Sequence, residues 1–110
     1  MKLPNAAYAI VDIEKLRDYC LSESHPRGKH KARVFATALG LTVADVVELR
    51  DAILSAIQAE EAALGERDKY GQRYIVDFSM ERQSKEAIVR STWIIRQGEN
   101  APRLTSCYVL

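Results

Sequence analysis

The hydrophobic periodicity of the chain changes once, near Gly71, and this change limits the folds open to it. Before Gly71 apolar residues recur at helical spacing, whereas after it they alternate with polar residues. A chain of 110 residues is long enough for one core. Helices followed by strands predict an α+β fold. We expect a single domain over residues 1–110, with a helical part over about 12–64 and a sheet part over about 72–110.

Three helices are predicted in the first part of the chain. The first begins at Asp12, a good N-cap residue. The second covers residues 29–39, where apolar residues recur on one face and Gly40 follows as a C′ residue. The third begins at Thr42, whose side chain can form a capping box with Asp45.

The third helix is expected to be the longest element. Its Ala- and Glu-rich end is predicted to continue to Leu64 and to stop at Gly65. Its expected buried stripe is Val43, Val46, Val47, Ile53, Leu54 and Ile57. One core is predicted to contain Ala32, Phe35, Leu39, Val46, Val47, Ile53, Ile57, Tyr74, Val76, Phe78 and Trp93.

The helices are expected to pack on one face of a C-terminal antiparallel sheet of three to four strands. The first strand carries one apolar face, formed by Tyr74, Val76, Phe78 and Met80. Residues 82–85 are a plausible hairpin connection, and a second strand follows from about Glu86 to Arg96. A turn rich in Gly, Asn and Pro then leads to a last strand over 103–109.

The other face of this sheet is predicted to be polar, with Asp77, Arg90, Thr92 and Arg96. The last strand adds either Arg103, Thr105 and Cys107 or Leu104, Ser106 and Tyr108, and alternation leaves both possibilities open. Arginines and hydroxyls near a histidine suit metal-independent cleavage of RNA. That reaction requires a base for the 2′-hydroxyl, an acid for the leaving oxygen and cations for the phosphorane charge. The alternative is an ordinary solvated sheet face.

The most basic segment lies around the start of the second helix and contains His25, Arg27, Lys29, His30, Lys31 and Arg33. Cations there oppose the helix dipole, and with the free backbone N–H groups they form a suitable anion site. Repulsion from Lys29 and Lys31 favours the neutral form of His30, as a general base requires. The alternative is a solvated basic turn.

Charge and composition restrict the partners. With 16 basic and 15 acidic residues, any nucleic acid must bind a local patch. The two cysteines, Cys20 and Cys107, are expected to be buried reduced thiols, with a disulfide as the alternative. Apolar runs too short for a signal peptide or a membrane span predict a cytoplasmic protein with no membrane partner. No metal-ligand cluster or cofactor motif is present, so no cofactor is expected.

Five stretches carry a resemblance to a known family: Leu3–Ala6, Ile13–Tyr19, His25–Phe35, Tyr70–Asp77 and Pro102–Tyr108. The chain resembles an uncharacterised bacterial domain family that is common in cyanobacteria as small stand-alone proteins. The resemblance covers nearly the whole chain and implies no established activity.

Two short motifs, Lys29-His30-Lys31 and Ser106-Cys107-Tyr108, are also similar to parts of the barnase, colicin D and RelE-like ribonuclease toxins. Those toxins place a basic helix before a sheet whose last strand carries a hydroxyl residue, frequently Thr, and an aromatic two positions on. This similarity and the polar sheet face together predict a catalytic set of His30, Arg90, Arg103, Ser106 and Tyr108. RNA phosphates would bind Arg27, Lys29, Lys31 and Arg33.

The expected partners are RNA and an antitoxin or another protein encoded by a neighbouring gene. The alternative is a non-catalytic module that holds protein or nucleic acid on the sheet face or basic helix. The two differ geometrically, because an enzyme should bring His30 or His25 within about one water of Arg90, Arg103 or Ser106 in a concave site.

Overall fold

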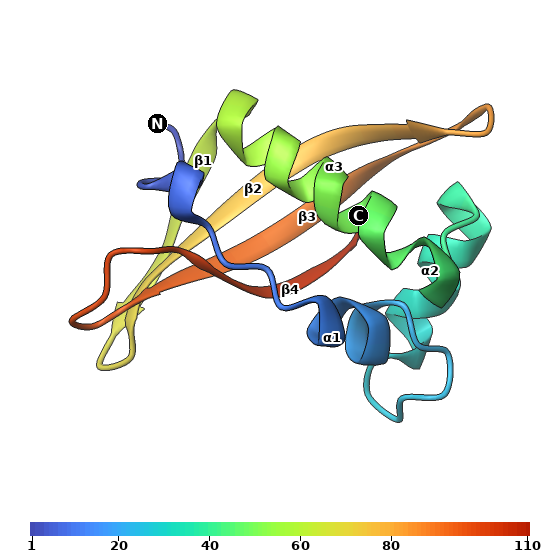
Figure 1. The fold of residues 1–110 in the computed structure, drawn as a ribbon, viewed down its shortest axis with the longest axis horizontal. Coiled ribbons are helices and arrows are strands. Elements are labelled where there is room, and N and C mark those ends of the chain that lie inside the picture. Colours follow the sequence, from blue (N-terminus) through green and yellow to red (C-terminus); the bar gives the residue numbers. More distant parts are fainter.

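The computed structural model describes residues 1–110 and places short helices before a four-stranded antiparallel sheet (Figure 1). The helical elements are α1 (Ile13–Lys15), which continues as a π-helix over Leu16–Cys20, α2 (Lys29–Leu39) and α3 (Val46–Ala59). The strands are β1 (Ala62–Asp68), β2 (Gly71–Arg82), β3 (Lys85–Arg96) and β4 (Arg103–Val109), in the spatial order β1-β2-β3-β4. The predicted α+β class and the order of helices before sheet are confirmed. No helix is both long and apolar enough to cross a bilayer.

Helix α2 occupies the range predicted from its apolar spacing. Ala32, Phe35 and Leu39 are buried on one face. Gly40 ends the helix with φ 66°, and its N–H donates to the carbonyl of Ala36 at 2.9 Å. Glycine reaches this left-handed conformation without a Cβ penalty, so the stop is encoded locally.

Helix α3 begins with the predicted capping box, in which Thr42 and Asp45 each accept a hydrogen bond from the other's backbone. A 3₁₀ turn over Val43–Asp45 precedes the α-helix. The predicted stripe is wrong at Val43 and Val47, which are 46% and 50% exposed. Val43 lies in the 3₁₀ turn, and the fully buried positions are Leu49, Ile53 and Ile57. Val47 lies two residues before Leu49, about 200° around the helix from it, and therefore faces solvent.

The prediction that the third helix continues to Leu64 is wrong. Helix α3 ends at Ala59, Glu60 is extended with ψ 156°, and Ala62 begins strand β1. Ala62 pairs with Val76 of β2, so a tertiary contact overrides the helix propensity of this Ala-rich segment. Gly65 is a strand residue at the β1 irregularity, where a Cβ would lie 3.2 Å from the Cβ of Arg73.

Strands β2 and β3 form a long hairpin that is paired in register from Gly71↔Arg96 to Arg82↔Lys85. Gln83 and Ser84 form its two-residue turn with φ values of 52° and 66°. Positive φ at both positions is typical of the type I′ turn, whose twist matches that of the strands. The predicted hairpin at 82–85 is therefore confirmed.

One hydrophobic cluster joins the helices to all four strands. On the strands it contains the predicted apolar face of β2 together with Ala62, Val89, Trp93, Leu104 and Cys107. The indole N–H of Trp93 donates to Ser91 Oγ at 2.9 Å, and Ser91 in turn donates to the carbonyl of Val76 at 2.7 Å. The buried indole N–H and the buried Ser91 hydroxyl therefore each have a hydrogen-bond partner.

Cys20 and Cys107 lie together in this core as free thiols, both buried as expected. The hydrogen bond from the Cys107 thiol lowers the pKa of Cys20 to about 7. The same neighbour, together with burial, raises the pKa of Cys107.

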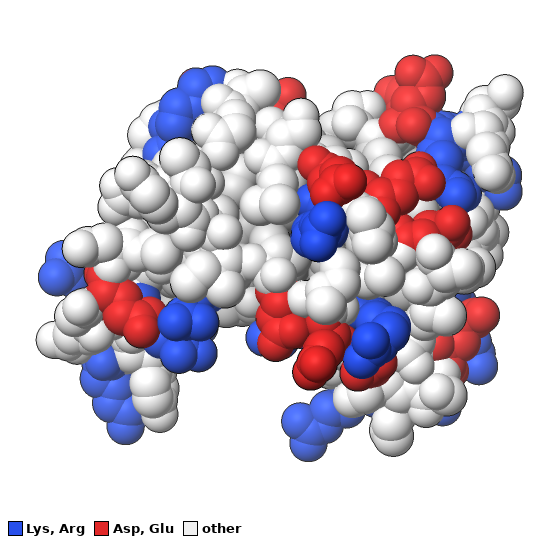
Figure 2. Space-filling model, in the orientation of Figure 1, with Lys and Arg blue, Asp and Glu red and all other residues white.

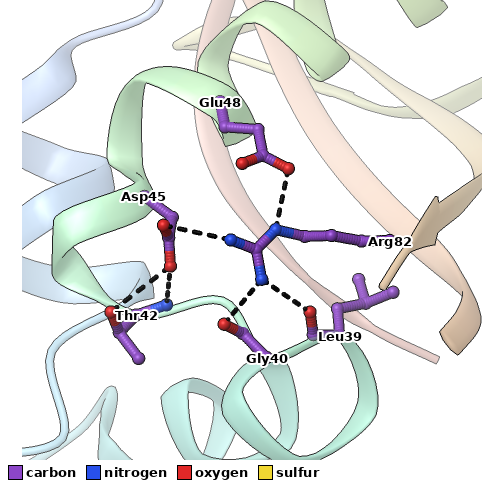
Figure 3. Close-up of polar contacts among 6 residues, drawn as sticks. All are labelled: Leu39, Gly40, Thr42, Asp45, Glu48 and Arg82. Carbon is purple, nitrogen blue, oxygen red and sulfur yellow. Dashed lines mark hydrogen bonds and ion pairs between the residues drawn. The ribbon is translucent and has the colours of Figure 1, made fainter. Parts of the chain in front are cut away.

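Arg82, at the tip of β2, connects the hairpin to both long helices (Figure 3). Its Nε donates to Glu48 at 2.7 Å, and a terminal nitrogen lies 3.1 Å from Asp45 at the start of α3. The other terminal nitrogen donates to the carbonyls of Leu39 and Gly40 at 3.1 and 2.8 Å. With a side chain only 12% exposed, this guanidinium fixes the α2–α3 corner against the sheet.

Replacing Phe35 by Ala should lower the free energy of unfolding by about 3–5 kcal/mol, because a fully buried aromatic loses its transfer energy and leaves a cavity. Chemical denaturation measures this. The half-exposed Val47 provides the control: Val47→Ala should change stability by less than about 0.5 kcal/mol. Equal effects of the two substitutions would contradict the packing described here.

Arg82→Lys should lower the free energy of unfolding by about 2 kcal/mol, because a single ammonium cannot reach two carboxylates and two carbonyls at once. The matched control is Arg50→Lys. Arg50 pairs only with its neighbour Asp51 and is 37% exposed, so the expected change is below about 0.5 kcal/mol. Indistinguishable melting curves for the two variants would show that the Arg82 contacts do not stabilise the junction of α2, α3 and the hairpin.

Candidate functional site

The turn before α2 is organised by His25. Its Nδ1 accepts hydrogen bonds from the backbone N–H groups of Arg27 and Gly28, each at 3.1 Å, and its carbonyl accepts from Lys29 N–H at 2.9 Å. The ring packs edge-on against Tyr19, with centroids 4.6 Å apart. Two donors on Nδ1 place the proton of the neutral ring on Nε2. His25 therefore acts as a structural acceptor at the start of α2.

Gly28 allows α2 to begin close to the preceding helix. A Cβ on this buried residue would lie 2.3 Å from the carbonyl oxygen of Tyr19, so no other residue fits without moving the backbone. No side chain caps α2 and no acidic residue lies in its first turn. His25 takes the N–H groups of Gly28 and Lys29, so those of His30 and Lys31 are the ones left without an acceptor, among basic side chains.

The four predicted anion-binding residues, Arg27, Lys29, Lys31 and Arg33, take part in none of the ion pairs of the molecule. Lys29 is half-buried, and the other three are exposed. Lys31 has one contact, in which its Nζ lies 4.4 Å from the centroid of the Tyr108 ring. This cation–π contact joins the basic end of α2 to the last strand.

Tyr108 belongs to a row of polar residues that crosses three strands. Arg90 on β3 pairs with Tyr108 on β4 and with Asp77 on β2. Arg90 Nε and a terminal nitrogen each donate to an Asp77 oxygen at 2.9 Å. Hydrogen bonding to Asp77 and, to a lesser extent, to Tyr108 raises the pKa of Arg90 above its ordinary value. We call Asp77, Arg90 and Tyr108 the cross-strand row, which Lys31 of α2 contacts at Tyr108.

The next position along the sheet carries hydroxyl groups. Ser106 pairs with Thr92, and its Oγ is buried with no hydrogen-bond partner. Thr92 Oγ1 lies 2.7 Å from Thr105 Oγ1. An irregularity in the β3–β4 register at Thr105 resolves the two possibilities for this strand: the bulge places Arg103, Ser106 and Tyr108 on the polar face, while Leu104 and Cys107 are buried.

Two predicted catalytic residues, His30 and Arg103, form no hydrogen bond or ion pair with the cross-strand row. Arg103 bonds to Glu99 at 3.1 Å and pairs with Ile94, four residues along β3 from Arg90. At ~3.3 Å per residue this separates the two arginines by ~13 Å. His30 is exposed and makes no hydrogen bond or ion pair of its own, although the adjacent Lys31 contacts Tyr108.

The cross-strand row lines none of the cavities in the structure. The three largest cavities lie beside Asn5, Tyr8 and Asn100, at about 470 Å³, between the β1–β2 and β3–β4 turns, at about 420 Å³, and between α3 and β2, at about 400 Å³. No group of three or more His, Cys, Asp or Glu side chains is placed to hold a metal ion. The row is thus a surface site.

The sequence analysis placed Asp77 on the polar face without assigning it a role in the site. The signal for its pairing was present in the hairpin: a two-residue turn at 83–84 fixes the register, and counting back along both strands places Asp77 opposite Arg90.

Comparison with known proteins identifies the family. The model of a domain of unknown function, DUF6883, matches residues 2–110. The chain belongs to this family. The expected membership of an uncharacterised family covering nearly the whole chain is thereby confirmed. No curated protein matches the DUF6883 chain.

Among solved structures, the DUF6883 chain is similar to a chain of a contact-dependent growth inhibition toxin–immunity protein complex from Klebsiella pneumoniae 342. The TM-score is 0.70 at 16% sequence identity, and the match covers 93% of this chain and 100% of the other. The similarity shows a shared fold.

Single-stranded RNA should bind the four free cations with a log–log salt slope near −3, from roughly −0.7 per neutralised phosphate. A fluorescence titration between about 50 and 200 mM salt measures the slope. Lys31→Gln should reduce its magnitude by about 0.7, whereas the control Lys69→Gln, on the β1–β2 turn, should leave it unchanged. If RNA affinity did not change with salt concentration, or if RNA did not bind at about 50 mM salt, nucleic acid would be excluded as a partner of this surface.

Proposed function

We propose that the protein is a toxin-type, metal-independent ribonuclease that acts on RNA phosphodiesters through the N-terminus of α2 and the polar face of the sheet. One observation carries the proposal: the unpaired cations of α2 adjoin the cross-strand row through the contact between Lys31 and Tyr108. An anion held at the start of α2 would extend over Tyr108 towards Arg90.

Arg90 is suited to a phosphate because Asp77 occupies only part of its guanidinium. Two of its five N–H groups bond to the Asp77 carboxylate, so further donors remain for an oxyanion. The carboxylate also holds the guanidinium plane in one orientation, as a preorganised donor requires. Both predicted arginines bond to a carboxylate, but Arg90 is favoured over Arg103 because it pairs with Tyr108, whereas Arg103 pairs with Ile94, four residues further along β3.

The chemistry assigned to the site is attack of the 2′-hydroxyl on the adjacent phosphorus. His30 would accept the 2′-hydroxyl proton, and Lys31 and Arg90 would offset the phosphorane charge. The Tyr108 hydroxyl, beside Arg90, would supply a proton to the departing 5′-oxygen. The Ser106 Oγ lies next to the row but is buried, so no step of this reaction is assigned to it.

The toxin-type part of the proposal is supported by the fold shared with a chain from a toxin–immunity protein complex. We therefore include a neutralising partner protein, such as an antitoxin or another product of a neighbouring gene, among the expected partners.

A specific observation favours a second candidate, a non-catalytic module that holds RNA or protein. The cross-strand row lies outside every cavity, and His30 contacts no other member of the predicted catalytic set through a hydrogen bond or ion pair. Such a module would bind with the same salt dependence and cleave nothing.

Incubation of the purified protein with total tRNA and mRNA in EDTA should give fragments with 2′,3′-cyclic phosphate ends. His30→Ala and Arg90→Lys should each reduce the cleavage rate by ~10²–10⁴-fold, while Tm and RNA affinity change little. Arg17→Gln, which removes an exposed charge paired only with its neighbour Asp18, is the control and should cleave normally. Intact RNA would contradict the ribonuclease proposal and favour the non-catalytic module, whereas cleavage only after metal is added would contradict the metal-independent mechanism.

A further inference from the structure

The outer edge of β2 is only partly covered by β1. The pairing between them begins at Gly71 and ends where Ala62 meets Val76, although β2 continues to Arg82. Beyond Val76 no backbone hydrogen bond joins β2 to any segment other than β3. Figure 1 shows this part of β2 running past the end of β1 to the hairpin.

The register identifies the backbone groups left free. Arg82 and Lys85 flank a two-residue turn and therefore form a hydrogen-bonded pair. Alternation then directs the N–H and C=O groups of Asp77, Ser79 and Glu81 away from β3, towards the uncovered edge. Unpaired strand edges of this kind are templates for an additional strand.

A groove lies beside this edge. The cavity of about 400 Å³ between α3 and β2 is lined on α3 by Ala52, Ser55, Ala56 and Ala59 and on β2 by Phe78 and Met80. Neighbouring strands lie ~4.8 Å apart, and short side chains on the helix leave room for a backbone at that distance. The groove therefore offers free edge hydrogen bonds together with an apolar wall.

The rim of the groove is acidic. Glu60 and Glu81 are exposed and form no ion pair, while Glu48 is held by Arg82. Figure 2 shows acidic side chains gathered over α3 and towards the β2–β3 hairpin on this face. A second copy of the chain, pairing through the same edge, would bring its own Glu81 and Asp77 against these carboxylates, so like-charge repulsion disfavours it.

We propose that this groove binds an extended basic segment of a partner protein, which adds to β2 as a strand along Asp77–Glu81. Main-chain hydrogen bonds supply the affinity, small apolar side chains face Phe78 and Met80, and Lys or Arg side chains meet the acidic rim. The groove shares only Asp77 with the cross-strand row, the added strand using its backbone and Arg90 its carboxylate, and occupancy of the groove does not depend on ribonuclease activity.

The probe is a capped octapeptide in which Lys or Arg alternates with Val or Ala. On titration into the ¹⁵N-labelled protein, the largest shift changes should fall on residues 77–82, and the amides of Ser79 and Glu81 should exchange with solvent at least about tenfold more slowly. Two N-methylated forms of the peptide have the same charge. Methylation of the positions that face β2 should weaken binding at least about tenfold, whereas methylation of the alternate positions should be tolerated.

Charge is tested separately. The variant E60K/E81K should bind the octapeptide at least about tenfold more weakly, whereas E23K/E66K, with the same change in net charge, should bind normally. The proposal would be overturned if both methylated peptides bound equally well or if the shift changes fell outside residues 77–82. The absence of binding at about 1 mM peptide would overturn it as well. If the protein formed a dimer without peptide, and the Ser79 and Glu81 amides exchanged slowly with solvent in that dimer, the edge would bind a second copy of the chain and the proposal would be wrong.

Discussion

The arrangement of helices and sheet depends on one guanidinium. Arg82 directs its donors at three different segments: the C-terminal carbonyls of α2, the capping carboxylate of Asp45 and the side chain of Glu48 on α3. A cation is favoured beside the negative end of one helix, and the acids at the positive end of the next helix hold it there. A lysine offers one compact ammonium in place of this planar set of donors. Lys85, across the hairpin turn, adds a hydrogen bond from its Nζ to the Thr37 carbonyl of α2 at 3.2 Å, so the hairpin tip becomes part of the helical corner.

Helix α2 is thus held at both ends, by Arg82 at Gly40 and by the His25 turn against Tyr19 at Gly28. Eleven residues rise about 16 Å between these two points. With the helix fixed, its basic first turn cannot reorient away from the sheet, and Lys31 stays over Tyr108. Each cation at this end opposes the dipole by a few tenths to ~1 kcal/mol. A local arrangement that works against stability is expected at a site that uses those charges for binding.

Local signals account for the parts of the fold that the sequence predicted. Gly40, the Thr42 capping box and the two-residue hairpin turn each act over a few residues, and each appears where expected. Strand β1 was missed because its residues form helix readily in isolation, and only pairing with β2, a contact across the chain, makes them extended. The buried stripe of α3 was misplaced at Val43, which lies in the 3₁₀ turn, and at Val47, which lies about 200° around the helix from Leu49.

The candidate site, like the fold, could be predicted only in part. The pairing of Asp77 with Arg90 follows from the hairpin turn and can be found by counting residues back along both strands. The orientation of Tyr108 cannot be found in this way, because one extra residue at Thr105 reverses the alternation within β4. The contact between Lys31 and Tyr108 joins residues far apart in sequence, through packing that no periodicity encodes.

The nearly balanced charge of the chain conceals two surfaces of opposite sign. With 16 basic and 15 acidic residues, the net charge of +1 indicates neither a nucleic-acid-binding nor an acidic protein. In the fold, most arginines outside the start of α2 are paired with carboxylates, so the free cations concentrate there. Unpaired carboxylates remain along α3 and the β2 edge. Ion pairing thus neutralises many charges elsewhere, while four unpaired cations remain together at the start of α2 and unpaired carboxylates flank the groove between α3 and β2. A polyanion at α2 and a basic strand at β2 would each meet the sign that attracts it, and the two surfaces adjoin at Asp77.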